Sequence, residues 1–338
     1  MSSLLALAGL NLDRTFPELG ADAADRRRTA AMTLLLGAIR EAQGRGVDAL
    51  VFVGGLFDDR CVGPRTIESL VQILDAYSGQ VLIAPATDDE GFYAATTWGT
   101  RTYVWSAGDF AAAPELLGAV HGRAGQRGRG ELLPAALHAA GVTVLVDPEF
   151  GLDESSTWVA GSHDRHVITS GSVEAAAAGV TVLGPVNPDL GEPWAPAVLL
   201  TYDSVRVTSI EQVPLTTSPS AQTFPIDVSV FNTTSDLLSA ITKTVQTAPE
   251  WSVIELVGEL VQGVLLPATV QYDSPRDDVA IRTDAVSFGI TAPADNDHTA
   301  VAEFVRSLGN ANAVARDRHQ AIALGLAALV PSHGAEAL

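Results

Sequence analysis

Six side chains with oxygen donors fall in loops of the sequence, most of them just after segments predicted to be strands. They are Asn11, Asp13, Asp88, Asp89, Asp147 and Asp164. Carboxylate and amide oxygens are ligands that Mg²⁺ and Mn²⁺ prefer, so these residues could converge as an all-oxygen site for one such ion. Aspartates are also frequent in turns, where they accept hydrogen bonds from the backbone. In a chain this acidic, the sequence favours the second interpretation.

Other potential metal ligands and nucleophiles are isolated. His163 and His166 have a spacing that would suit zinc on a helix, but we expect them in a loop without a Cys or a third His nearby. Cys61 is the single cysteine, which excludes an intrachain disulfide and a cysteine-rich zinc site. We therefore expect structural roles for these three residues.

The elements that would position the aspartate-bearing loops alternate between strand and helix. Strands are expected at 4–8, 48–53 and 81–84, and helices at 22–43 and 66–77. This order predicts an α/β fold, with parallel strands joined by crossover helices. Such sheets bind ligands at the loops that follow the carboxyl ends of the strands. The loops after Ala8, Val53 and Ala84 are therefore where a site is expected.

The chain continues with further strands and a second, smaller unit. Apolar and alternating runs predict strands at 142–146, 158–160, 180–183, 197–202 and 205–210. We expect a Thr-, Ser- and Pro-rich linker at 216–225, a small α+β domain at 226–294 and a helical tail at 295–338. The tail has an apolar stripe, which would suit a partner helix as well as its own domain. The stripe consists of Phe304, Val305 and Leu308.

The charge of the chain limits the partners to expect. The 338 residues include 40 acidic and 20 basic side chains, for a net charge of -20. This charge counts against a general attraction to nucleic acid or anionic lipid. The runs Arg26–Arg28 and Arg123–Arg129 are the basic concentrations, and a solvated surface explains them better than DNA contacts. The N-terminus lacks a basic leader and its apolar run is too short for a bilayer, so we expect a cytoplasmic protein.

Three loops carry a resemblance to a known family. They are Gly54-Gly55-Leu56-Phe57-Asp58, Pro85-Ala86-Thr87-Asp88-Asp89-Glu90-Gly91 and Val159-Ala160-Gly161-Ser162-His163-Asp164-Arg165. In their residues and in their order along the chain, they resemble the Gly-Asp-Leu-Phe-Asp, Gly-Asn-His-Asp and Gly-His-x-His loops of SbcD-type DNA repair nucleases. These nucleases belong to the calcineurin-like metallophosphoesterase superfamily. The resemblance covers most of the first 215 residues.

The resemblance also shows which expected metal ligands have been replaced. The first Asp and His of the family fall on Gly9 and Asn11, and the bridging Asp on Gly55. The remaining ligand and catalytic positions fall on Thr87, Asp88, Asp147, Ser162 and Asp164. Positions that shape the loops are retained at Gly54, Phe57, Asp58, Asp89 and Gly91. Two divalent ions without their bridging carboxylate would repel one another in a low-dielectric pocket, so this pattern indicates a degenerate site without catalytic residues or metal.

What the resemblance implies is a four-layer α/β/β/α sandwich at 1–215, a capping domain and a helical tail. The implied function is a structural or regulatory subunit of an SbcC-like SMC-type ATPase in DNA repair or in defence against foreign DNA. A homodimer is a further assembly that it allows, DNA would be met only through the complex, and no membrane is involved. The alternative is an active Mn²⁺- or Mg²⁺-dependent nuclease or phosphodiesterase, with an altered site at Asn11, Asp88, Asp147 and Asp164. A weaker third idea is that the acidic body mimics DNA.

Overall fold

The computed structural model divides the chain into two compact units. The first comprises Met1–Pro17 and Ala21–Ser220, and the second Glu18–Gly20 and Ala221–Leu338. The residues that the structure describes are 1–58, 62–86, 90–106, 111–113, 120–122, 124, 144–146, 148, 166–170, 180–203, 206–215, 221–261, 264, 266 and 276–288. Each unit has its own sheet structure and hydrophobic core.

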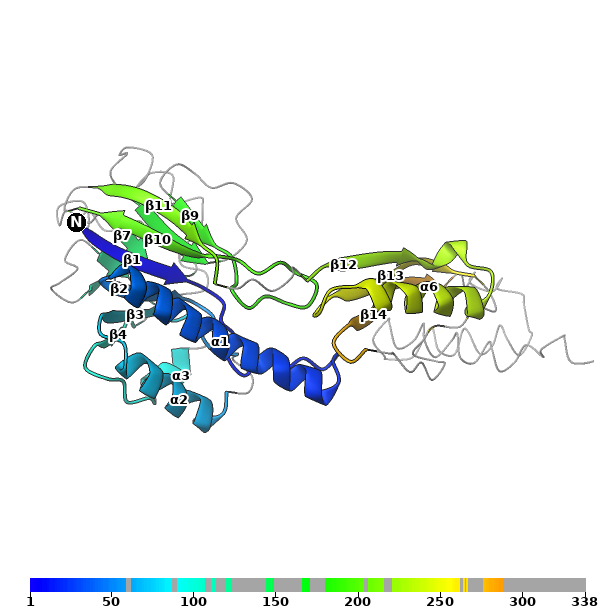
Figure 1. The fold of residues 1–338 in the computed structure, drawn as a ribbon, viewed down its shortest axis with the longest axis horizontal. Coiled ribbons are helices and arrows are strands. Elements are labelled where there is room, and N and C mark those ends of the chain that lie inside the picture. The colour runs from blue at the N-terminus through cyan, green and yellow to red at the C-terminus, as the bar shows by residue number, and fades with distance from the viewer. Residues whose placement is uncertain are drawn as a thin grey trace, which may run out of the picture. The chain divides into compact units, whose positions relative to one another are not determined.

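The first unit is built on a six-stranded sheet of order β11-β10-β1-β2-β3-β4 (Figure 1). Its strands are β1 (Ser2–Leu7), β2 (Ala49–Val53), β3 (Gln80–Ala84), β4 (Thr102–Val104), β10 (Ala197–Tyr202) and β11 (Val207–Val213). The pairs from β1 to β4 are parallel, whereas β10 runs antiparallel to both β1 and β11. The prediction of parallel strands with crossover helices is therefore confirmed for this sheet.

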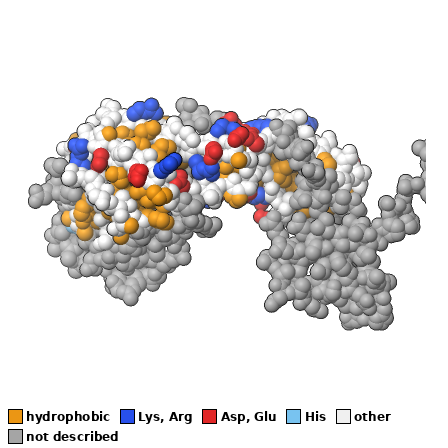
Figure 2. Space-filling view, turned by 90° about the horizontal axis from the view of Figure 1, so that it is seen from below, with side chains coloured by type: hydrophobic (Ala, Val, Ile, Leu, Met, Phe, Trp, Pro, Cys, Tyr) orange, Lys and Arg blue, Asp and Glu red, His pale blue; other side chains and the backbone are white. Residues whose placement is uncertain are grey.

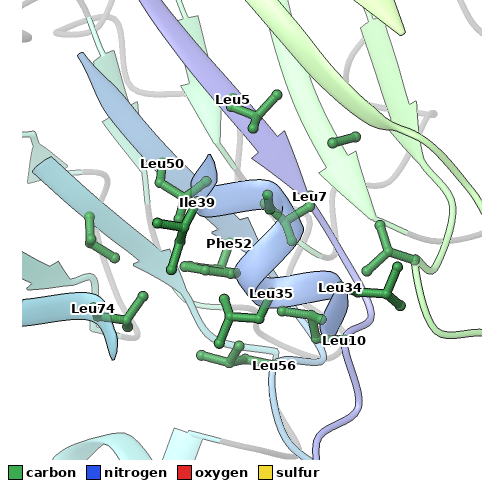
Figure 3. Packing of buried hydrophobic residues seen from close by; sticks show 14 of the residues in the cluster. Leu5, Leu7, Leu10, Leu34, Leu35, Ile39, Leu50, Phe52, Leu56 and Leu74 are labelled. Atoms are coloured by element: carbon green, nitrogen blue, oxygen red, sulfur yellow. The ribbon is translucent and has the colours of Figure 1, made fainter. Parts of the chain in front are cut away.

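Helices cover one face of this sheet. They are α1 (Ala21–Arg45), α2 (Pro64–Asp75) and the short α3 (Glu90–Ala94). Apolar residues of α1 recur at helical spacing, so that Leu35, Ile39 and Ala42 pack on the sheet residues Leu7 and Phe52 (Figure 3). The helix ends where Gly46 takes a φ of +63°, a conformation that glycine adopts without strain. The resulting core fixes the loops that lead into and out of β1 and β2.

A second sheet lies on the other face of the first. It has the order β5-β6-β7-β8-β9, with β5 (Ala111–Ala112), β6 (Val120–Gly122), β7 (Val144–Val146), β8 (His166–Ser170) and β9 (Val180–Leu183). One core cluster joins Leu4, Val51 and Leu82 of the first sheet to Val144 and Ile168 of the second. Alternate residues of each strand thus face the helices or the second sheet. The first unit is a mixed α/β structure rich in parallel strands.

The second unit contains a three-stranded sheet of order β12-β13-β14 with one helix. The elements are β12 (Thr223–Asp227), the 3-10 helix η2 (Val228–Val230), α6 (Thr234–Thr247), β13 (Val253–Leu260) and β14 (Ala280–Phe288). Thr233 caps α6, because its hydroxyl accepts a hydrogen bond from the backbone N–H of Asp236 at 3.1 Å. Buried Leu237, Ile241 and Val245 of α6 join the core of this unit.

Several elements differ from the sequence predictions. The three strands of the second unit are parallel, so its described part is a parallel arrangement and not the expected α+β one. The reason is that α6 is a crossover between β12 and β13, a direction that the local pattern does not encode. β12 begins at Thr223, inside the stretch 216–225 that was predicted to be a linker. His166 lies buried in β8 and not in a loop, because its side chain packs at the sheet interface.

Some short strands were not predicted from the sequence. They are β4, β5, β6 and β8, whereas the comparably short β7 and β9 were predicted. The predicted strand at 158–160 and the tail 295–338, with Phe304, Val305 and Leu308, lie outside the described residues. Within the described part of the chain, no helix is long and apolar enough to cross a membrane.

Candidate functional site

The loops that follow β1 and β2 run side by side beyond the carboxyl edge of the first sheet. The backbone N–H of Asn11 donates to the carbonyl of Gly55 at 2.8 Å, and that of Leu12 to Leu56 at 3.0 Å. In return, the N–H of Asp58 donates to the carbonyl of Leu12 at 3.0 Å. The parallel pairing of the two strands therefore continues into their loops. This edge is where α/β sheets bind ligands, and the sequence placed its candidate site here.

Both loops depend on left-handed backbone conformations. Gly9 has a φ of +60° and Gly55 a φ of +58°, in a region that side chains with a Cβ rarely occupy. Asn11 and Asp13 also have positive φ values, of 45° and 63°, which Asn and Asp tolerate better than other residues. The residue types at these positions are thus the ones that the backbone path requires.

Other residues of the protein fill the space around Gly9 and Gly55. A Cβ atom at Gly9 would lie 2.6 Å from the Cβ of Pro185, closer than any real contact. A Cβ atom at Gly55 would lie 3.1 Å from the Cα of Gly9 and 3.2 Å from Oδ1 of Asn11. A side chain at position 9 would need Pro185 to move, whereas one at position 55 would need Gly9 and Asn11 to shift by a few tenths of an ångström. The described residues therefore do not fit a pair of divalent ions held from positions 9 and 55.

Two asparagines join the loop after β1 to the segment that follows β9. Asn187 is fully buried, and its Nδ2 donates to the carbonyl of Leu10 at 2.9 Å while its backbone N–H donates to Gly9 at 3.0 Å. Nδ2 of Asn11 donates to the carbonyl of Asn187 at 3.1 Å. Oδ1 of Asn187 accepts no hydrogen bond from the described residues. Asn187 therefore binds the loop after β1 through the hydrogen bonds that its Nδ2 and backbone N–H donate.

The carboxylate of Asp13 contacts the backbone at the start of helix α2. Its Oδ2 accepts a hydrogen bond from the backbone N–H of Gly63 at 2.7 Å, and Gly63 immediately precedes α2. A carboxylate there satisfies an unpaired helix donor and interacts favourably with the positive end of the helix dipole. This hydrogen bond is of the kind expected of a turn or loop-capping aspartate.

Arg27, the middle residue of the basic run, lies in the interior. Its guanidinium lies 3.9 Å from the centre of the Trp194 ring, and Nη2 donates to the carbonyl of Pro188 at 3.0 Å. Burial and the nearby charge of Arg14 lower the pKa of Arg27 to about 10, against an opposing effect of Asp189. The side chain therefore stays protonated near neutral pH, as a cation between α1 and the segment after β9.

The other charges of this region are paired with one another. Arg28 forms an ion pair with Asp25, and Arg14 forms one with Asp189. On the face shown in Figure 2, Lys and Arg side chains lie among acidic and apolar ones and do not form one basic area. The run Arg26–Arg28 therefore does not present three adjacent cations to a DNA backbone.

The retained positions have roles in packing. Phe57 is buried, with its ring centre 5.3 Å from that of Tyr93 and 6.2 Å from that of Phe92. The backbone N–H of Gly54 donates to the carbonyl of Ala84 at 2.8 Å, which connects the loop after β2 to the end of β3. Gly91 lies in α3. That the retained positions shape the loops stays a prediction.

Most of the other predicted site residues cannot be placed. Thr87, Asp88, Asp89, Asp147, Ser162 and Asp164 lie outside the described residues, and so do Cys61 and His163. Among the described residues, no group of three or more His, Cys, Asp or Glu side chains is close enough to hold a metal ion. Sequence reasoning missed Asn187, Arg27 and Trp194 as parts of this region. The Asn187-Pro188 pair is a turn signal that marked the segment but not its contacts.

Comparisons with known proteins add little to this description. No protein-family model and no curated protein matches the chain. Among 61 matching chains of solved structures, one crystal structure has 13% sequence identity and a TM-score of 0.35, covering 62% of this chain and 98% of the other. A likeness at this level carries no argument about fold or function.

Proposed function

We propose that this protein is a catalytically degenerate SbcD-like subunit, with a structural or regulatory role beside an SbcC-like SMC-type ATPase. Its context would be DNA repair or defence against foreign DNA. The observation that carries the proposal is the tight packing around Gly9 and Gly55. These are the positions where the resemblance expects a metal-binding Asp and the bridging Asp.

The packing matters because it extends beyond the substituted residues. If only the side chains had been lost, the loops would leave space where carboxylates once pointed. Instead, Pro185 lies against Gly9, and Gly9 and Asn11 lie against Gly55. The backbone hydrogen bonds between the two loops are also complete from Asn11 to Asp58. This supports a scaffold whose loops are now built for contact with one another.

The finer fold belongs to the same proposal. In this proposal, the two sheets packed face to face and the helices on the outer face of the first would correspond to three of the four layers of a metallophosphoesterase sandwich. We infer that helices cover the outer face of the second sheet, that the second unit corresponds to the capping domain, and that the tail 295–338 binds the ATPase. The stripe of Phe304, Val305 and Leu308 would contact the coiled coil of that partner.

The test is co-purification of the full chain with a co-expressed ATPase that has P-loop halves and a long coiled coil. We expect a stoichiometric complex from which Phe304→Asp with Leu308→Asp dissociates. Ser307→Asp, which adds a charge beside that stripe, is the matched control and should remain bound. Failure of the wild-type chain to bind any such ATPase would contradict the partnership.

Metal analysis separates this proposal from the alternative of an active enzyme. The purified chain is incubated with Mn²⁺, desalted and assayed for bound ion and for cleavage of linear DNA and a generic phosphodiester. We expect neither a stoichiometric ion nor turnover above that of the buffer. Chelator-sensitive cleavage by the wild-type chain would establish the nuclease or phosphodiesterase with an altered site instead. The assay is repeated on the ATPase complex, because a partner chain could supply ligands.

A further inference from the structure

The strand β11 forms one edge of the first sheet and is unusually accessible. It has seven residues, Val207–Val213, and the five from Thr208 to Gln212 are exposed. Ile210, at its centre, is 49% exposed, one of few large apolar side chains so open to solvent among the described residues. β11 pairs with β10 along one side only, so its other side carries N–H and C=O groups that no described strand meets.

The other described edges have features that discourage pairing with a further strand. β4 has three residues, β5 has two and β9 has four, so each is a shorter edge than β11. β12 contains Pro225, which lacks an N–H, and β14 carries the charged residues Arg282 and Asp284. β11 has no proline or lysine and one charged residue, Glu211, whose carboxylate is bound by Arg45 at 2.9 Å.

The sequence of β11 is compatible with pairing to a second copy of itself. In an antiparallel strand pair, side chains directly opposite each other point to the same face of the sheet. A two-fold axis perpendicular to the sheet therefore passes between one residue and the same residue of the second copy. Centred on Ile210, this register sets the seven residues opposite one another, with Val207 opposite Val213 and Ser209 opposite Glu211. The irregularity that β11 has against β10 falls at Thr208, two residues from this centre. No charge then lies directly opposite a like charge.

Neighbouring registers are less favourable. Centred on Glu211, two carboxylates would lie directly opposite each other, which destabilises a strand pair. Centred on Ser209, only the residues from Val207 to Glu211 would find partners within the strand. The register at Ile210 alone joins the most residues and buries the two exposed isoleucines against each other.

We propose that the protein forms a symmetric dimer through antiparallel pairing of β11 with β11 of a second copy, centred on Ile210. The two six-stranded sheets become one continuous sheet across the two-fold axis. β11 contains none of the residues assigned above to the candidate site or to binding of the ATPase, so the dimer does not depend on the ATPase partnership.

Sedimentation velocity of the full chain tests the dimer, from about 1 µM to about 300 µM, where an interface of one strand pair should be partly formed. We expect reversible dimerisation in the wild type and its loss in Ile210→Lys, which places two ammonium groups opposite each other. Val230→Lys is the matched control, because Val230 is 65% exposed on the second unit and should leave dimerisation unchanged. Circular dichroism and thermal unfolding establish that both variants are folded.

A disulfide trap tests the register. In a Cys61→Ser background, Ile210→Cys should form a covalent dimer on mild oxidation, because directly opposite residues have the Cα separation that a disulfide needs. Gln212→Cys alone should not, since it would face Thr208, whereas Thr208→Cys with Gln212→Cys should. A wild type that stays monomeric over the whole concentration range, or a dimer insensitive to Ile210→Lys, would overturn the proposal. If the wild type stays monomeric, the unpaired edge of β11 would be available to a strand of another protein.

Discussion

At the scale of single residues, the candidate site is defined by glycines and amides. Gly9 and Gly55 let two loops run side by side in close contact, and Asn11 and Asn187 join the loop after β1 to the segment after β9. Each of these residues has a packing or hydrogen-bonding role that is visible in its contacts. Their identities are therefore constrained by the loop structure alone.

Gly9→Ala should destabilise the first unit by about 2–4 kcal/mol, because the left-handed φ and the contact with Pro185 both penalise a Cβ atom. Chemical denaturation measures the change. Gly44→Ala is the matched control: it lies in α1 with no atom within 4 Å of its added Cβ. This substitution should stabilise the protein by up to about 1 kcal/mol, because alanine favours a helix. Equal effects of the two substitutions would contradict the packing argument.

At the scale of elements, two polar side chains, partly buried Arg276 and buried His166, connect secondary structures. Arg276 lies between the carboxyl end of α6 and the start of β14, where it binds Asp278 through Nε at 2.9 Å and Nη2 at 2.6 Å. Its Nη1 donates to the carbonyls of Val245, at 3.3 Å, and Ala248. In the first unit, His166 of β8 is hydrogen-bonded to Oγ1 of Thr181 in β9 at 2.6 Å.

Arg276→Ala should destabilise the second unit by about 2–3 kcal/mol, because Asp278 would be left partly buried without its partner and the last carbonyls of α6 without a donor. Arg276→Lys should recover only part of this loss, since an ammonium cannot contact the carboxylate and both carbonyls in the same planar geometry. Denaturant unfolding followed by far-UV circular dichroism measures both. Full recovery by lysine would show that charge alone matters.

His166 should make stability depend on pH. Burial lowers its pKa from 6.5 to about 4, so the unfolded chain binds more protons than the folded one between these values. The free energy of unfolding should therefore rise as pH increases from about 4 to about 6.5, by up to about 3 kcal/mol from this residue. Below pH 4 and above pH 6.5 its contribution stays constant.

The variant His166→Leu isolates that contribution. Acidic residues also titrate in this range, so the quantity to compare is the difference in unfolding free energy between wild type and variant at each pH. This difference should change by the expected amount between the two pKa values and be flat outside them. A difference independent of pH would show that His166 is already solvated in the folded protein.

At the scale of the whole molecule, the net charge of -20 on 338 residues is the dominant long-range property. Self-repulsion of this charge destabilises the compact state at low ionic strength. It also explains why the proposed role reaches DNA through a partner and not through the acidic chain itself.

Raising NaCl from about 20 mM to about 200 mM should therefore raise the thermal midpoint by a few degrees, because the Debye length falls well below the distances between surface charges. Differential scanning calorimetry measures the shift. Tetramethylammonium chloride at the same ionic strength is the control and should act equally, since screening does not depend on the cation. A lower midpoint in either salt would show that ion pairs such as Arg14–Asp189 outweigh the repulsion.

The amino-acid sequence determined the strands and helices whose patterns are long and local. The helix around Leu35 and Ile39, the strand at 49–53 and the replacement of ligands by Gly9 and Gly55 were all readable, because periodicity and residue type depend on the chain itself. The tertiary structure alone decided that Pro185 and Asn187 meet the loop after β1, that Arg27 is buried on Trp194 and that the strands around α6 are parallel. These features join residues up to 177 positions apart, and such contacts arise from packing between elements that no local pattern records.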